Sequence, residues 1–412
     1  MLRKENFGAR IRNARVVGSV KAHEEDMKLA STQIKDEDDD VPMGDGGEGH
    51  SKAQPLDRSV LPPQFILLQL DTGDSLFLRL CQLESGKLGF VSSRHRVTKP
   101  MLTIQPGSHL AVDPSSRYMA IGCSERLLTI HALYSRSQLN EQSSTGRGLR
   151  HVESELIISL SGLILKMEFL YPSPDDEGHI ILLVLVMIKG KTRMLVYEWE
   201  TGSDLKQIRP HHPKGHLLEL SRQMPLLLIP LTLKSSFILV CEDSMAVCHG
   251  ILQGSPTFID FNNRVDMPTE LHHGSGKPLW TAWTRPPRLP GYARVRDDIY
   301  IAREDGLIKF LEIDSTEDEF VKAHNNIGEF GANCGTALAC LDFEIQHNRS
   351  GDLLITGGES CPGGTYLVRK PSSLYARVGE LICSCLADQT TLERSKKNTH
   401  ANSIDPQLGT ST

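Results

Sequence analysis

One glycine-rich segment has residue types that could bind phosphate. Gly274-Ser275-Gly276-Lys277 resembles the end of a phosphate-binding loop, in which backbone N–H groups and a lysine hold phosphate oxygens. Leu271 stands where that motif needs its first glycine, and Pro278 stands where it needs the hydroxyl group that reaches magnesium. The segment is therefore interpreted as an ordinary loop, and the sequence predicts no cofactor site.

Histidines and cysteines cluster without the remaining ligands of a metal site. His211, His212 and His216 offer imidazoles to zinc, but no cysteine or carboxylate lies at the spacing of a structural zinc site. Cys383 and Cys385 face one side of an expected strand, too close along it for a typical disulfide and without a second pair for zinc. We interpret them as loop and core residues and predict no metal site.

Catalytic patterns are also absent from the sequence. No Gly-x-Ser-x-Gly nucleophile motif occurs. The recurring acids Asp113, Asp243 and Asp305 lie at expected strand ends and turns, where carboxylates cap backbone N–H groups. The sequence therefore predicts no catalytic residue and no small-molecule substrate.

The one unusual surface segment is 280–296, WTAWTRPPRLPGYARVR, which combines arginines with aromatic rings before an expected strand. Arginine beside aromatic rings suits both protein-binding hot spots and phosphate contacts. A solvated loop without a partner is the more ordinary interpretation, and at least one of Trp280 and Trp283 is expected in the core. The candidate contacts to a partner or to nucleic acid are Trp283, Arg285, Arg288, Tyr292, Arg294 and Arg296.

Composition limits the classes of protein that fit. The chain has 412 residues with 45 Lys plus Arg and 51 Asp plus Glu, so its net charge of −6 gives no overall field that attracts a polyanion. No uninterrupted apolar run reaches the roughly 18 residues of a membrane-spanning helix, so we expect no membrane contact. Nine cysteines, an odd number found mostly in apolar runs, fit a reducing compartment such as the nucleus or cytosol.

Short apolar runs rich in β-branched residues, broken by Asp, Gly, Ser and Pro, predict strands rather than helices. Six pairs of such runs predict hairpins. The pairs are 65–70 with 75–80, 118–123 with 127–133, 180–188 with 193–199, 237–241 with 245–249, 299–302 with 307–313, and 353–356 with 366–368. Further apolar runs that precede many of the hairpins are 110–113, 163–170, 226–231, 279–283 and 337–343.

The hairpins recur with a mean step of about 58 residues, which is longer than a WD40 repeat but still indicates a repeat fold. Three or four strands per step are typical of a propeller blade. We expect residues 1–20 to hold the first propeller strand, 21–60 to be a disordered acidic insert, 61–388 to form the blades and 389–412 to be a disordered tail. The polar stretch 134–150 is predicted to be a loop.

Several segments, in order along the chain, resemble one family of propellers. HLAVDPSSRYMAIGCSERLLTIHAL (109–133) is similar to the family block that contains Asp-Pro-x-x-Arg, and ENFGARIRNARVV (5–17) to its Phe-Gly-x-Ile strand. MEFLY (167–171), LVYEW (195–199) and AREDGLIKFLEID (302–314) resemble later blocks. The family contains the large subunits of the UV-damaged-DNA-binding protein and of the cleavage and polyadenylation specificity factor, and a propeller subunit of splicing factor 3b.

This resemblance implies an all-β fold, an incomplete seven-bladed β-propeller with four-stranded antiparallel blades. It also implies a non-enzymatic scaffold in the nucleus, a subunit of a multi-protein complex for DNA repair with ubiquitin ligation, or for splicing or 3′-end formation of pre-mRNA. RNA or DNA would then be reached through the complex. The alternative is direct binding of RNA or damaged DNA, which needs a clustered basic face. A propeller enzyme would need convergent acids or a metal in its channel.

Overall fold

The computed structural model describes the elements of the fold with gaps between them. The described residues are 7–18, 64–82, 88–96, 109–123, 126–145, 148–173, 175–176, 178–218, 224–233, 235–242, 244–254, 256–261, 278–286, 296–314, 321–329, 337–345, 349–357 and 364–369. The predicted insert 21–60 and tail 389–412 lie outside them, so both remain predictions.

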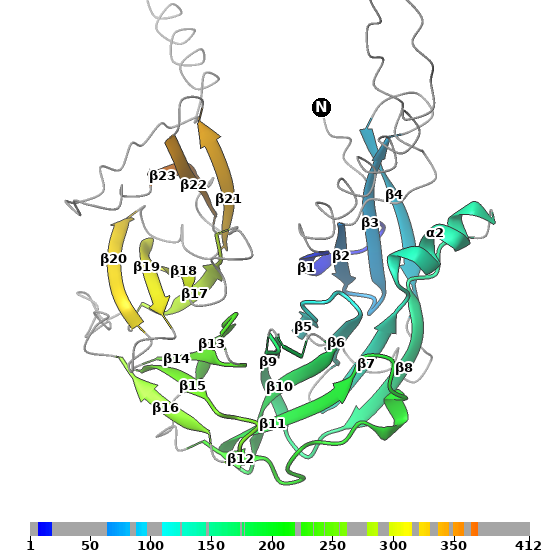
Figure 1. Ribbon diagram of the computed structural model, residues 1–412, viewed down its shortest axis with the longest axis horizontal. Coiled ribbons are helices and arrows are strands. Elements are labelled where there is room, and N and C mark those ends of the chain that lie inside the picture. The colour runs from blue at the N-terminus through cyan, green and yellow to red at the C-terminus, as the bar shows by residue number, and fades with distance from the viewer. Residues whose placement is uncertain are drawn as a thin grey trace, which may run out of the picture. The chain divides into compact units, whose positions relative to one another are not determined.

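The described strands form six antiparallel sheets (Figure 1). In each sheet, strands that lie next to one another are also consecutive in the sequence. Three of the sheets hold β1 (Ile11–Val17), β2 (Phe65–Leu70), β3 (Ser75–Gln82), β4 (Leu88–His95); β5 (His109–Val112), β6 (Tyr118–Cys123), β7 (Leu127–Leu133), β8 (Val152–Ser159); and β9 (Leu163–Leu170), β10 (His179–Ile188), β11 (Lys191–Glu200), β12 (His216–Leu217). The others hold β13 (Pro225–Pro230), β14 (Phe237–Cys241), β15 (Met245–His249), β16 (Thr257–Asp260); β17 (Trp280–Thr284), β18 (Arg296–Arg303), β19 (Leu307–Asp314), β20 (Val321–Glu329); and β21 (Ala337–Ile345), β22 (Arg349–Gly357), β23 (Gly364–Arg369).

Each of the six predicted hairpins is confirmed as a pair of neighbouring strands in one sheet. The hairpin of β10 and β11 shows why the sequence folds this way. Seven successive residues of β10, Ile180–Val186, are buried, and Lys189 and Gly190 between the strands both have positive φ, at 51° and 73°. A two-residue turn with positive φ at both positions matches the right-handed twist of the flanking strands. The five apolar runs predicted ahead of the hairpins are also strands, namely β5, β9, β13, β17 and β21.

The expected number of blades is wrong. The described residues form five four-stranded antiparallel blades, and the sixth sheet has three strands, whereas seven blades were expected. Each described sheet contains one of the six hairpins read from the sequence. No predicted hairpin corresponded to a seventh blade, because the expectation of seven blades came from the family resemblance alone.

The predicted loop 134–150 is also wrong in part, because Arg136–Ser144 forms the helix α2. Ser135 caps its start: the side chain accepts a hydrogen bond from the Gln138 backbone N–H, and the Gln138 side chain accepts one from the Ser135 N–H. This reciprocal capping box stabilises a helix whose composition is almost wholly polar. No helix in the described part of the chain has the length and apolar character to cross a membrane.

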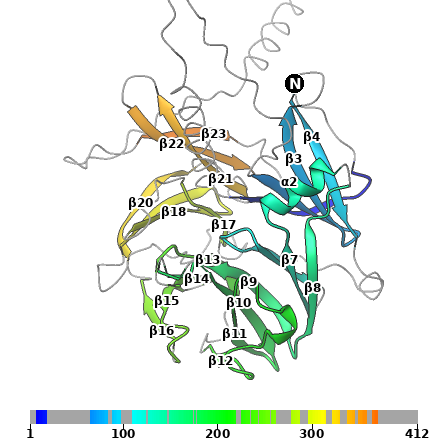
Figure 2. The ribbon, with the colours of Figure 1, turned by 45° about the vertical axis from the view of Figure 1, so that its right-hand side comes forward.

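The chain divides into two compact units, one of Met1–Ile238 with Cys248–Phe258 and the other of Leu239–Val247 with Ile259–Thr412. In the first unit, adjacent blades pack through their apolar faces. Tyr118 and Ile130 of one blade lie in one buried cluster with Phe169 and Trp199 of the next, and Figure 2 shows these two sheets side by side. A second cluster, with Leu67 and Phe77, joins β1–β4 to β5–β8.

The second unit is built by the same kind of packing. Tyr300, Ala302 and Ile308 of the β17–β20 blade are buried with Leu354 of β22. In the sheet β13–β16, every residue of the strand β14 is buried. Cys241 and Cys248 of this sheet are buried, and burial raises the pKa of both thiols. They act as core residues, as the apolar runs around them suggest.

Candidate functional site

The predicted contact segment begins on β17, an end strand of the β17–β20 blade. Trp280 is 1% exposed and lies in the core, while Trp283 on the same strand is half-buried. The expectation that at least one of the two belongs to the core is confirmed. Arg288, Tyr292 and Arg294 lie outside the described residues.

The guanidinium group of Arg285 is held by its own blade. Its Nε and Nη2 donate to the two carboxylate oxygens of Asp297 at 2.7 and 2.9 Å, and it lies 5.6 Å from the centre of the Trp283 ring. Asp297 is almost wholly buried, and the Arg285 side chain is 18% exposed. Paired hydrogen bonds of this kind fix both the position and the plane of a guanidinium group. Asp297 therefore holds the Arg285 guanidinium group in place beside the Trp283 ring.

Arg296, at the start of β18, also faces carboxylates. Its Nη1 lies 3.3 Å from Glu312 Oε1, and its Nε lies 3.4 Å from Asp314 Oδ2. Both acids belong to β19, which pairs with β18. The structure therefore matches the two described arginines of the segment with acids of the same blade.

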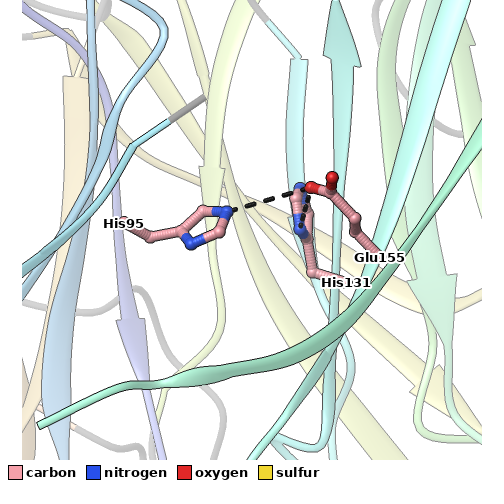
Figure 3. Close-up of side chains that lie close together, drawn as sticks. All are labelled: His95, His131 and Glu155. Carbon is pink, nitrogen blue, oxygen red and sulfur yellow. Dashed lines mark ion pairs between the residues drawn. The ribbon is translucent and has the colours of Figure 1, made fainter. Parts of the chain in front are cut away.

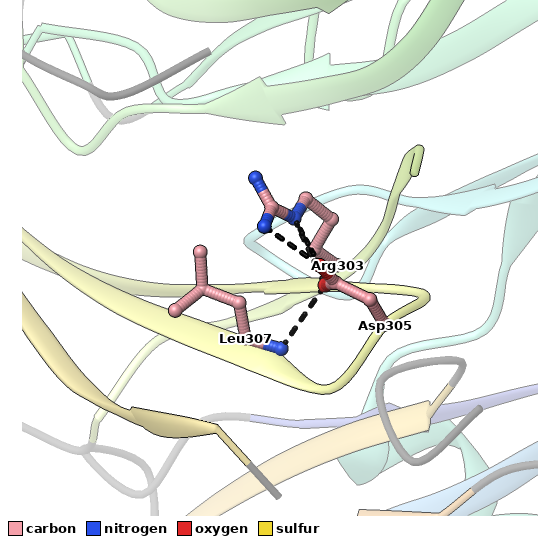
Figure 4. Close-up of polar contacts among 3 residues, drawn as sticks. All are labelled: Arg303, Asp305 and Leu307. Atoms are coloured by element: carbon pink, nitrogen blue, oxygen red, sulfur yellow. Dashed lines mark hydrogen bonds and ion pairs between the residues drawn. The ribbon is translucent and has the colours of Figure 1, made fainter. Parts of the chain in front are cut away.

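Two of the three recurring acids act as the sequence predicts. Asp113 accepts hydrogen bonds from the Ser115 hydroxyl and the Arg117 N–H, and its burial raises its pKa to about 6. Asp305 accepts hydrogen bonds from Arg303 and from the Leu307 N–H at 3.2 Å (Figure 4). Burial raises the pKa of Asp305, but these hydrogen bonds outweigh it and the pKa lies below its ordinary value. Asp243 lies outside the described residues.

A cavity in the first unit is lined by charged and aromatic side chains. It has a volume of about 390 Å³ and lies between the end of β4, at residues 93–96, and the segment 149–155 that leads into β8. Arg94, Arg96 and Arg150 line it together with His95, His151 and Glu155. We call it the β4–β8 cavity. Its residues come from two neighbouring blades, so no single stretch of sequence predicts it.

His151 forms one wall of the β4–β8 cavity and is held firmly. Its ring stacks on Phe77 with the ring centres 4.3 Å apart and the planes 8° from parallel. Arg79 Nε donates to His151 Nε2 at 3.4 Å, and the Ser93 hydroxyl lies 2.6 Å from His151 Nδ1. Burial, with a smaller contribution from the positive Arg79, lowers the pKa of His151 to about 3, so the ring is neutral at ordinary pH.

A second group is His95, His131 and Glu155 (Figure 3), of which His95 and Glu155 line the same cavity. His95 ends β4, and His131 of β7 is the direct cross-strand partner of Glu155 on β8. Burial lowers the pKa of His131 to about 3 and also lowers that of His95, so both rings are neutral at ordinary pH. Sequence reasoning missed this group, because its three residues are brought together only by strand register and by the packing of two blades.

The histidine segment 211–216 gains a carboxylate partner that sequence spacing did not reveal. His211 Nδ1 lies 2.6 Å from Glu198 Oε1, and His179 Nε2 lies 3.4 Å from the other oxygen of the same carboxylate. Glu198 comes from β11, beside which residue 210 forms an isolated bridge to Tyr197. The segments Gly274–Lys277 and Cys383–Cys385 lie outside the described residues.

The five four-stranded antiparallel blades make the chain an all-β propeller protein. Residues 1–398 match the family described as the RSE1/DDB1/CPSF1 first beta-propeller, and the chain belongs to that family. The resemblance inferred from the ordered sequence blocks is therefore confirmed. A comparison with curated proteins found no match. Propellers of this family are generally non-catalytic scaffold domains that bind proteins.

Proposed function

We propose that this protein is a non-enzymatic nuclear scaffold, a subunit of a multi-protein complex that acts in DNA repair with ubiquitin ligation, or in splicing or 3′-end formation of pre-mRNA. The family match supports the scaffold role, because this propeller serves protein interaction in its family. Rigid blades with variable connecting loops suit this role and require no chemistry of the propeller itself.

The segment 280–296 is the proposed contact with a protein partner. The observation that carries it is the half-buried Trp283 ring beside the Arg285 guanidinium group, which is held by two hydrogen bonds to Asp297. Aromatic and arginine side chains are enriched among interface hot spots. Side chains already held in one conformation lose little entropy on binding, so they contribute more net affinity.

Direct binding of RNA or damaged DNA is the less favoured function. A phosphate that approached Arg285 would compete with Asp297, and one that approached Arg296 would compete with Glu312 and Asp314. The net charge of −6 adds no long-range attraction. We therefore expect RNA and DNA to be reached through partner proteins.

Affinity purification of the tagged full chain from cells, with mass spectrometry of the bound proteins, tests the proposal. Cullin-ligase, splicing or polyadenylation subunits would each identify one pathway. Replacing Trp283 with alanine should weaken the capture of those subunits by about 2 kcal/mol of affinity if Trp283 is a hot spot. Phe258→Ala is the matched control, because Phe258 is an exposed aromatic residue on another blade.

Two outcomes would contradict the proposal. If the Trp283→Ala variant captured the same subunits as the original chain, segment 280–296 would not be the contact. If the tagged protein were found only in the cytoplasm, the nuclear role would be wrong. The nucleic-acid alternative has its own readout. Submicromolar binding of RNA or DNA at about 150 mM salt, with the steep salt dependence of phosphate contacts, would support the alternative. If that binding were lost on replacing Arg285, Arg288, Arg294 and Arg296, nucleic-acid binding would become the primary function.

A further inference from the structure

The group His95, His131 and Glu155 has the composition and placement of a metal site. Two blades contribute to it: His131 and Glu155 are cross-strand partners on β7 and β8, and His95 comes from the end of β4 in the neighbouring blade. Paired residues of an antiparallel sheet project from the same face. Figure 3 shows the His95 ring directed toward the two side chains from the other blade.

The ligand atoms are already close together. His95 Nε2 lies 4.0 Å and His131 Nδ1 lies 3.9 Å from Glu155 Oε2, and all potential ligand atoms of the group lie within 4.8 Å of one another. With zinc–nitrogen and zinc–oxygen bonds of about 2.0–2.2 Å, the ligand atoms of a tetrahedral site are about 3.3–3.5 Å apart. Small side-chain rotations would therefore bring the three atoms to bonding positions.

The two imidazole nitrogens that face the carboxylate lack a hydrogen-bond partner among the described residues. His95 Nε2 and His131 Nδ1 are both buried and unsatisfied. The His131 side chain is 5% exposed, so water does not readily replace the missing partner. Buried polar atoms almost always have a partner, and an exception calls for an explanation. An ion between the rings and the carboxylate would satisfy both nitrogens.

We propose that His95, His131 and Glu155 bind one divalent transition-metal ion, of which Zn²⁺ fits the ligands best. Two imidazole nitrogens and one carboxylate oxygen suit zinc, whereas magnesium and calcium prefer oxygen ligands. Three protein ligands leave a fourth coordination position. That position would face the β4–β8 cavity, where Arg94, Arg96 and Arg150 favour an anionic donor.

Titration of Zn²⁺ into the metal-free full chain by calorimetry tests this site. We expect one equivalent bound at the site, and replacing His95 with alanine should lower its affinity at least about tenfold. His211→Ala is the matched control, because His95 and His211 have side chains that are each 29% exposed and each lies near one glutamate. This control should leave the affinity unchanged.

A second pair of variants separates coordination from charge. Glu155→Gln should also lower the affinity at least about tenfold, whereas Glu153→Gln, which removes a carboxylate from the same strand and cavity, should change it less than about twofold. These variants keep the test decisive if His131→Ala fails to fold, because His131 is buried.

X-ray absorption of the zinc-loaded protein identifies the ligands directly. We expect only nitrogen and oxygen neighbours at about 2.0–2.2 Å. A sulfur neighbour at about 2.3 Å would place the zinc on cysteines and overturn the proposal. The proposal also fails if the metal-free chain binds no zinc with a dissociation constant below about 100 µM, or if His95→Ala and His211→Ala have equal effects.

Discussion

Replacing Arg285 with alanine should destabilise the second unit, although the residue stands at the edge of a blade. Its guanidinium group faces Asp297, whose side chain is only 2% exposed. Removal of one partner from a buried ion pair leaves the other charge buried with less compensation and costs about 3–5 kcal/mol. Since the Arg285 side chain is 18% exposed, we expect the lower end of that range, about 3 kcal/mol.

The reverse substitution should cost less. In Asp297→Ala the long Arg285 side chain can turn its charge toward water, because it is partly exposed already. We expect a loss of about 1–2 kcal/mol from the missing charged hydrogen bonds. Replacing both residues with apolar ones, as in Arg285→Met with Asp297→Leu, should cost less than Arg285→Ala alone, since no isolated charge is left.

Urea unfolding followed by tryptophan fluorescence measures these losses. The chain has three tryptophans, and two of them, Trp280 and Trp283, lie on β17, with Trp283 next to the Arg285 guanidinium group. An unchanged dependence of the unfolding free energy on urea would confirm that the variants differ in stability alone. The reasoning would be refuted if Arg285→Ala lowered the free energy of unfolding by less than about 1 kcal/mol. It would also be refuted if the double variant lost as much stability as the two single variants together.

Three further predictions concern the first unit. Because burial raises the pKa of Asp113 to about 6, the folded state favours its protonated form. The contribution of Asp113 to stability is greatest below about pH 4, and about 3 kcal/mol of it is lost as pH rises through 6; Asp113→Asn should remove this dependence from unfolding measured across that range. Gly162→Ala should lower stability by about 1–3 kcal/mol, since the new Cβ would lie 2.4 Å from the Met187 carbonyl oxygen, while Gly148→Ala, with nothing within 4 Å, should leave the melting temperature unchanged. Ser135→Ala should destabilise α2 by about 1 kcal/mol, seen as faster hydrogen exchange of residues 136–144 and contradicted by unchanged protection.

The central strands of the blades could be predicted from the sequence, because they contain short apolar runs, which in β10 and β14 are nearly continuous. β10 and β14 are buried along most of their length, and burial on both faces requires such continuous runs. The fourth strands could not be located in the same way. β8 is largely exposed and β12 has only two residues, so neither has a strong apolar pattern. They are held by pairing with the third strand of their blade.

The helix α2 and the group His95, His131 and Glu155 illustrate two other limits of prediction from the sequence. The signal for α2 was the pair Ser135 and Gln138 at capping-box spacing, which an argument from apolar periodicity overlooks in a polar stretch. The group around His131 has no sequence signal of its own. Its assembly depends on the register of β7 with β8 and on the contact with another blade, and neither follows from residue spacing.

β1 reaches its place in the first blade at an unusual entropic cost. It pairs with β2 through residues 11–17, yet residues 18–64 separate the two strands, whereas β2 and β3 are joined by Asp71–Asp74 alone. Loop closure over the longer connection costs about 2 kcal/mol more. The Arg15 guanidinium offsets part of this cost by donating to Glu168 on β9, two blades along the chain. Among the described strands of its blade, β1 is thus the one whose place depends most on contacts between residues far apart in the sequence.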